Sequence, residues 1–99
     1  MIFAELEYSA EYEDFHAELK RYLAQHFKHV ESGLQGDSWF WIFEGPDKVA
    51  IDTFSSMKHQ VKATSPGPLV RRVIAVLRLA YGVREYSCPE LEPHESDAP

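Results

Sequence analysis

The sequence has only one cysteine, Cys88, among its 99 residues. This excludes an intramolecular disulfide and a zinc site built from several cysteines. No apolar run reaches the roughly 18 residues that a membrane-spanning helix needs. The amino terminus also lacks the cationic start and long apolar stretch of a secretory signal. Because a lone thiol suits a reducing compartment, these absences favour a cytoplasmic protein with no membrane partner.

Familiar catalytic and cofactor-binding patterns are missing as well. The sequence contains no Walker loop, no dinucleotide fingerprint, no Cys-x-x-Cys pair and no Gly-x-Ser-x-Gly elbow. His26 and His29 would share one face of a helix, but no third metal ligand follows at a recognisable spacing. We therefore expect no metal, no cofactor and no catalytic residue, and the sequence favours a protein that is not an enzyme.

Basic residues are absent from both ends of the chain. Residues 1–19 hold six acidic side chains and residues 85–99 hold five, with no Lys or Arg in either stretch. Residues 53–84 show the reverse pattern, with six basic side chains and no acidic one. The net charge of −6 argues against nucleic acid as a partner, because neutralisation of phosphates dominates such binding.

The basic stretch suggests one anion site. Four basic side chains flank the expected start of a second helix, whose N–H groups and dipole attract negative charge. They are Lys58, Lys62, Arg71 and Arg72. The alternative is that the acidic ends of the chain pair with the basic stretch inside the molecule.

Hydrophobic residues make up 44% of the chain and charged residues 26%, the balance of a single globular domain. Alternation predicts a strand over residues 2–8. Ser9 is expected as an N-cap, and apolar residues at steps of three and four predict a helix over 10–28. Two glycines and several turn formers predict a loop over 31–38.

The segment Trp-Phe-Trp-Ile-Phe at 39–43 has strong strand character. A turn at 44–47 and a returning strand over 48–54 complete a hairpin. Period-two alternation then predicts a third strand over 57–62. This part of the chain is therefore expected to form an antiparallel meander.

A second helix is expected after the prolines at 66 and 68, since proline is tolerated at a helix start. Its apolar residues from 69 to 81 cover a broad face, and Gly82 is the expected C-cap. Residues 83–87 suggest a short last strand. Residues 88–99 are acidic and proline-rich, which is typical of a flexible tail.

These elements predict an α+β domain over residues 1–87, in which two helices cover one face of an antiparallel sheet. The expected order is β-α-β-β-β-α. If 57–62 were a loop and 84–87 a strand, the order would become the ferredoxin-like β-α-β-β-α-β.

The aromatic hairpin supports the leading hypothesis of function. Alternation turns Trp39, Trp41 and Phe43 to one face of the sheet, and two helices can cover only the other. Exposed aromatic patches mark interfaces. We therefore expect a binding or self-assembly module that docks a protein partner, or a second copy of itself, on this face.

Two alternatives remain open at this point. The first is a small-ligand-binding protein or enzyme with a pocket between the hairpin and the second helix, where Asp52, His59 and Arg72 supply polar groups. A half-buried Asp52 would then have a raised pKa. The second is recognition of anions or phosphates by the basic segment 58–84.

Overall fold

The computed structural model describes residues 1–92 of the chain. Within them, six strands and two helices succeed one another in the order β-α-β-β-β-β-α-β. Their bounds are β1 (Ile2–Glu7), α1 (Tyr12–His26), β2 (Val30–Gln35), β3 (Asp37–Glu44), β4 (Asp47–Asp52), β5 (Gln60–Lys62), α2 (Pro68–Arg78) and β6 (Gly82–Glu90). Neither of these helices is long and apolar enough to cross a membrane.

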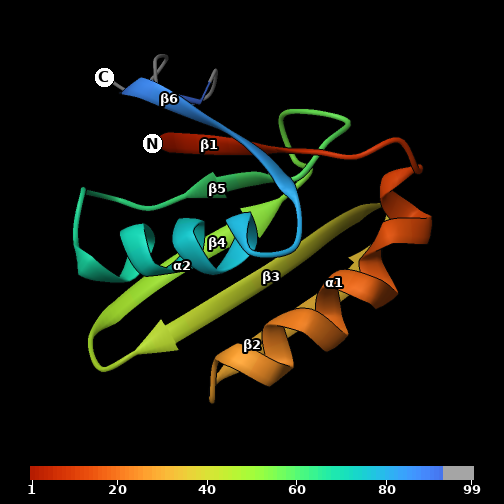
Figure 1. Cartoon of the computed structure of the whole chain (residues 1–99), viewed down its shortest axis with the longest axis horizontal. Helices are drawn as coiled ribbons and strands as arrows, with labels where there is room; N and C mark the ends of the chain where they lie inside the picture. The colour runs from red at the N-terminus through yellow and green to blue at the C-terminus, as the bar shows by residue number, and fades with distance from the viewer. Residues whose placement is uncertain (93–99) are drawn as a thin grey trace.

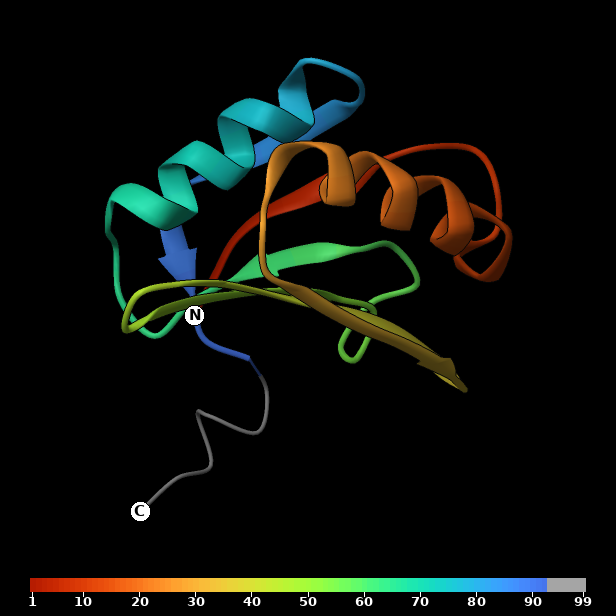
Figure 2. The same ribbon diagram turned by 90° about the horizontal axis from the view of Figure 1, so that it is seen from below.

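The six strands form one antiparallel sheet in the spatial order β2-β3-β4-β5-β1-β6. Both helices pack on the same face of this sheet, α1 against β2 and β3, and α2 against β4, β5 and β6 (Figure 1; Figure 2). The predicted two-layer α+β fold is therefore confirmed. The ferredoxin-like alternative is wrong, because residues 60–62 form a strand between β4 and β1.

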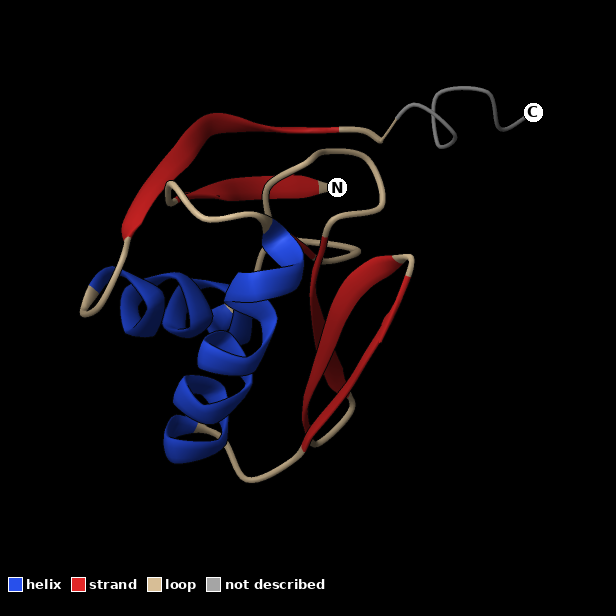
Figure 3. Cartoon of the chain, turned by 90° about the vertical axis from the view of Figure 1, so that its right-hand side faces the viewer, coloured by secondary structure: helices blue, strands red, loops and turns tan. Residues whose placement is uncertain are grey.

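The sheet curves around its helices. The register of β1 shifts between Ile2 and Ala4 against both neighbouring strands, which marks a β-bulge. A bulge increases the local twist and bends the strand that contains it. As a result, β1 and β6 turn towards the helices instead of continuing the plane of β2, β3 and β4 (Figure 3).

The loop predicted over 31–38 is in fact strand β2 and its turn into β3. The turn residue is Gly36, whose φ of +80° lies in the left-handed region that favours glycine. The other glycine, Gly33, lies inside β2 opposite Trp39. The two glycines thus serve a tight turn and a strand, and the prediction that took them both as loop formers missed a hairpin.

Element ends also differ from the prediction. Helix α1 begins at Tyr12, and its N-cap is Glu11 rather than Ser9. Helix α2 ends at Arg78, so Gly82 is not its C-cap but the first residue of β6. In both helices the predicted apolar face is correct and the predicted capping residue is not. Burial of the apolar face stabilises a helix more than a single cap does.

Only the last three residues of the strand predicted over 57–62 belong to β5. In the segment between β4 and β5, side chains accept hydrogen bonds from backbone N–H groups two residues further along. The N–H of Phe54 donates to Asp52 Oδ1 (3.1 Å), and the N–H of Lys58 donates to Ser56 Oγ (3.2 Å). Such local bonds compete with strand pairing, and residues 54–58 form bends in place of a strand.

Strand β6 is longer than the strand predicted over 83–87 and continues through Cys88 to Glu90. It therefore includes the first three residues of the predicted tail. Beyond the strand, Leu91 is exposed but Glu92 is buried. The rest of the predicted tail, residues 93–99, lies outside the described residues.

The hydrophobic core lies between the helices and the sheet. Alternation along β3 turns Phe40 and Ile42 towards the helices, and both are fully buried. Helix α1 contributes Leu19 and Leu23, and helix α2 contributes Leu77, all with no exposed surface. The face formed by Trp39, Trp41 and Phe43 is thus the one that the helices leave open.

We expect Leu77→Ala to lower the free energy of unfolding by about 2–5 kcal/mol, because it leaves a cavity in this core. Urea denaturation followed by circular dichroism measures the change. Leu79→Ala is the matched control, since Leu79 lies two residues along the chain and is 77% exposed. Equal losses for the two variants would contradict the placement of α2 on the sheet.

Candidate functional site

The open face of the sheet carries a row of aromatic side chains. Trp39, Trp41 and Phe43 are each half-buried there. The indole of Trp39 lies flat across Gly33, where an added Cβ would come within 2.6 Å of the ring. The rings of Trp39 and Trp41 are in contact, with centroids 4.5 Å apart. Trp39 therefore lies along the sheet, and the contact between the two indoles shields part of the surface of each.

A cross-strand row beside the tryptophans combines large and small side chains. Trp41 on β3 pairs with Ala50 on β4, and Ala50 pairs with Lys62 on β5. All three side chains belong to the open face. Since Ala50 has only a methyl group, the sheet is hollowed between an indole and a lysine.

Lys62 is buried on this otherwise water-facing side. Its side chain is only 6% exposed, and its Nζ donates to Asp52 Oδ1 at 2.5 Å and to Glu92 Oε2 at 2.6 Å. Glu92 also accepts a hydrogen bond from Ser55 Oγ at 2.7 Å. We refer to Asp52, Lys62 and Glu92 as the ionic cluster.

Burial dominates the electrostatics of Asp52. It raises the pKa of the Asp52 carboxyl, while the hydrogen bond and charge of Lys62 oppose the shift. The backbone N–H of Phe54 also bonds to the carboxylate and favours its charged form. The direction agrees with the sequence-based hypothesis for Asp52, but the partner that limits the shift is Lys62.

A cavity of about 650 Å³ opens beside the ionic cluster. Its aromatic walls are Trp41 and Phe54, its polar side is the ionic cluster, and Ala50 and Lys48 complete the sheet side. The opposite side is the loop of residues 63–67 and the first turn of α2. Pockets for small ligands in proteins have this size and this mixture of apolar walls and few polar groups.

The first turn of α2 brings positive potential to the cavity wall. No side chain caps this helix, and its first turn has no acidic residue. The first N–H groups of a helix have no partner inside it, and here they belong to Leu69 and Val70, because Pro68 has none. Both residues line the cavity, so the positive end of the helix dipole lies beside it.

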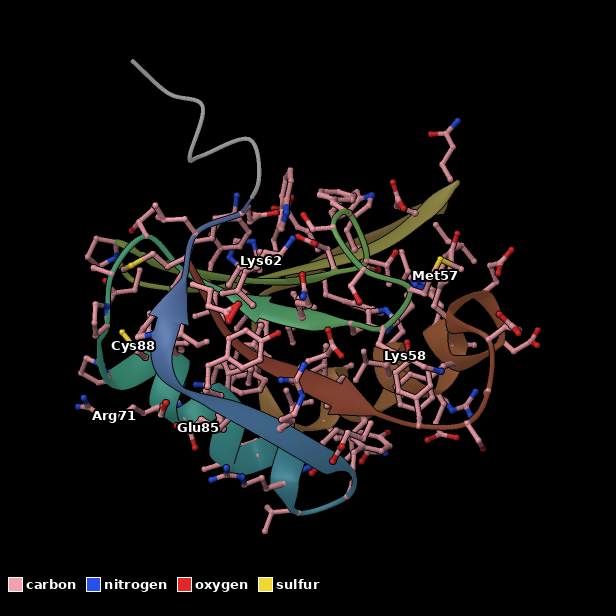
Figure 4. All side chains as sticks on the ribbon, turned by 90° about the horizontal axis from the view of Figure 1, so that it is seen from above. Met57, Lys58, Lys62, Arg71, Glu85 and Cys88 are labelled. Atoms are coloured by element: carbon pink, nitrogen blue, oxygen red, sulfur yellow. The ribbon has the colours of Figure 1, made fainter. Side chains whose placement is uncertain are left out.

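The four predicted anion contacts do not gather into one site. Lys58, Lys62 and Arg71 lie well apart (Figure 4). Lys58 donates to the carbonyl of Ala10, and Arg72 pairs with Glu44. Of the four, only Lys62 lines the cavity.

The predicted polar pocket of Asp52 and His59 does not form either. Asp52 pairs with Gln60 across β4 and β5, which places the preceding residue, His59, on the helix side of the sheet. Arg72 is not among the residues of the cavity wall. The cavity between the hairpin and α2 thus exists, but Asp52 is the only one of these three polar groups that lines it.

His59 belongs instead to a buried chain of hydrogen bonds. Its Nδ1 is 2.7 Å from the hydroxyl of Tyr8, and its Nε2 is 2.7 Å from Ser38 Oγ. Ser38 Oγ in turn is 2.6 Å from Nδ1 of His16. Every group is satisfied when Tyr8 donates to His59, His59 to Ser38, and Ser38 to His16. These hydrogen bonds could not be predicted from the sequence, because Tyr8, His16, Ser38 and His59 belong to four separate segments of the polypeptide.

Both histidines of this chain favour the neutral form. Burial, and secondarily the charge of His16, lowers the pKa of His59 to about 4. Burial and then Lys20 lower the pKa of His16 as well. Ser38 has no exposed surface, so this serine–histidine arrangement is closed to a substrate and serves the core.

Metal-binding side chains do not cluster in residues 1–92, where no group of three or more His, Cys, Asp or Glu could hold an ion. A second hollow of about 520 Å³ lies at the end of α1, beside His26 and His29. Its polar side chains include Arg72 and Glu44, which pair with each other. The open-face cavity is therefore the stronger candidate site.

The buried histidine predicts how stability depends on pH. The pKa of His59 is lower in the folded chain than its ordinary value of 6.5, so the unfolded chain binds more protons between these values. Stability from neutral His59 is complete above about pH 6.5 and is lost towards pH 4, a change of up to about 3 kcal/mol. Urea denaturation at pH 7.5, 6, 5 and 4.5 measures it.

The matched variants are His59→Gln and His26→Gln. The first should flatten the pH dependence between pH 6.5 and 4.5, and the second, at an exposed histidine, should keep it. If the free energy of unfolding of the wild-type chain stays constant over this pH range, His59 is not held neutral in the folded chain.

Comparison of the chain with protein-family models, with curated proteins and with solved structures finds no match. What the protein binds is therefore inferred from its own side chains.

Proposed function

We propose that this protein binds a small molecule in the open-face cavity. The observation that carries the proposal is the hollow at Ala50, bounded by Trp41 and Phe54 and by the buried ionic cluster. Its volume of about 650 Å³ suits a ligand of small-molecule size. The exposed and unpaired Cys88 supports our further proposal that the protein works in the reducing cytoplasm.

The cost of the ionic cluster supports a role in recognition. A buried ion pair often contributes less to stability than well-packed apolar residues of the same volume, because both charges lose their hydration. On this side of the sheet, an exposed lysine would avoid that cost. A charged group held beside aromatic walls is what a binding site for a polar ligand requires.

Ala50→Leu should abolish ligand binding, because the larger side chain fills the hollow between Trp41 and Lys62. Ala50 is only partly buried, so the added methyl groups can extend into the cavity without disturbing the core. A fragment set of aromatic acids, amines and neutral compounds, titrated into ¹⁵N-labelled protein, provides the measurement. Shifts should centre on the amides of Ala50, Ala63, Gly67 and Leu69.

Ala75→Leu serves as the control, since Ala75 is exposed on α2 and is not part of the cavity wall. It should bind the same fragments with unchanged affinity. If no fragment shifts the cavity amides, or if Ala50→Leu binds as well as the wild-type chain, the proposal fails.

A second candidate function is self-association through the aromatic face, with a second copy of this chain as the partner. It is supported by the half-buried, mutually contacting indoles of Trp39 and Trp41 and by Phe54, which is 53% exposed and lines the same cavity as Trp41. A two-fold dimer would bring the same apolar patch of both copies together. Tryptophan is also the residue most enriched at interface hot spots.

Sedimentation velocity tests this second candidate. The wild-type chain should form a dimer as its concentration rises from about 10 µM to 1 mM, the range expected for a small interface. Trp39→Ser should remain monomeric, whereas Leu79→Ser, at an exposed position on the helix side, should dimerise like the wild type. If the wild-type chain stays monomeric over the whole range, self-association is refuted, and the proposal of ligand binding in the cavity is unaffected.

A further inference from the structure

The ionic cluster holds two carboxylates around one lysine. Asp52 alone balances the charge of Lys62, and it lies on the neighbouring strand β4. Glu92 adds a second carboxylate at 2.6 Å from the same ammonium group. The ammonium group of Lys62 thus bonds to two carboxylates, one from the neighbouring strand and one from beyond the last strand.

Glu92 reaches the cluster from outside the sheet. Strand β6 ends at Glu90, and Leu91 beyond it is 59% exposed. Nevertheless, Glu92 is buried, lines the cavity and accepts hydrogen bonds from Lys62 and from Ser55. A carboxylate from beyond the last strand thus accepts one of the hydrogen bonds that Lys62 Nζ donates at the cavity wall.

With Glu92 displaced, the cavity lining favours an anion, because the ammonium groups of its lining residues Met1, Lys48 and Lys62 then outnumber the carboxylates of Asp47 and Asp52. The uncapped end of α2 contributes positive potential to one wall, and Lys48 places its ammonium 4.0 Å from the centre of the Trp41 ring. The carboxylates of Asp52 and Glu92 are already bonded to Lys62. Lys62 also lies over the ring of Phe54, 5.7 Å from its centre, so an aromatic anion would pack against the exposed parts of Trp41 and Phe54 beside both ammonium groups.

We propose that the cavity binds an aromatic carboxylate, whose carboxylate group takes the place of Glu92 on Lys62 while its ring lies between Trp41 and Phe54. Glu92 then acts as a resident competitor that closes the site in the absence of ligand. This inference rests on the proposed small-molecule function and adds the class of ligand and the way in which the site is controlled.

The exchange conserves charge at the lysine. One carboxylate leaves Lys62 and returns to water, and another takes up the same hydrogen bond from Nζ, while Asp52 stays in place. The ligand gains the contacts of its ring, which Glu92 lacks. Because Glu92 is tethered to the chain, it competes at a high effective concentration and lowers the apparent affinity of the ligand.

Three ligands with one ring system separate the chemistry of the ligand from the existence of the site. They are 2-naphthoate, 2-naphthamide and 2-naphthylmethylamine, which share the naphthalene body and differ in charge. Titration of the full chain by calorimetry and by ¹⁵N NMR gives the dissociation constants. The expected order of affinity for the wild-type protein is 2-naphthoate, then the amide, then the amine.

Glu92→Gln should bind 2-naphthoate about tenfold more tightly, because a site closed about nine-tenths of the time by its own carboxylate shows one-tenth of its intrinsic affinity. The control Glu90→Gln removes one negative charge from an exposed residue of β6, two positions away, and should bind as the wild type does. Lys62→Gln, checked for folding by circular dichroism, should lose the preference for 2-naphthoate over 2-naphthamide.

The possible results separate this inference from the proposed function. If the amine binds most tightly at the cavity amides, the anion class is wrong and the small-molecule function stands. If 2-naphthoate binds but Glu92→Gln has the affinity of the wild type, Glu92 is not a competitor. If none of the three ligands nor any member of the fragment set shifts the cavity amides, both proposals are overturned.

Discussion

Two helices cover only one face of a six-stranded sheet. The other face must shield its apolar surface from water with its own side chains, and the aromatic row, the ionic cluster and the cavity all lie on it. On the helix side, Phe40 and Ile42 are fully buried. On the open side, the indole of Trp39 lies flat over Gly33 and shields apolar surface without any covering element. Ser55, in the segment after β4, bonds to the buried side chain of Glu92, which in turn bonds to Lys62 and shields it from solvent. The cavity is the space that this partial covering leaves beside Ala50.

The ionic cluster is a weak source of stability. Coulomb attraction in a buried pair is offset by lost hydration. A chain that needed only a tight fold would gain as much from apolar residues at 52 and 62. Under the proposed small-molecule function, charges held at fixed positions beside an apolar hollow would instead orient a polar ligand.

Local patterns made much of the fold predictable, whereas contacts between distant residues did not. Period-two alternation around Trp39 and Trp41 correctly assigned the faces of β3, and the apolar spacing of both helices placed them on one layer. The relation between Asp52 and His59 depended on the register of β4 against β5, in which Asp52 faces Gln60. The bends at 54–58 separate these two strands, and alternation alone does not reveal where β5 begins after them. The contact between Lys62 and Glu92 spans 30 residues and has no local signal.

The chain of Tyr8, His59, Ser38 and His16 has a consequence for how this sequence can change over time. Each inner member donates to one neighbour and accepts from another, so a single exchange in the middle, such as Ser38→Ala, strands two buried imidazoles at once. Apolar side chains of matching shape at all four positions can be nearly neutral for stability, whereas replacing one inner member alone leaves buried partners without a hydrogen bond. The effect of a substitution at any one of these four positions therefore depends on the residues at the other three.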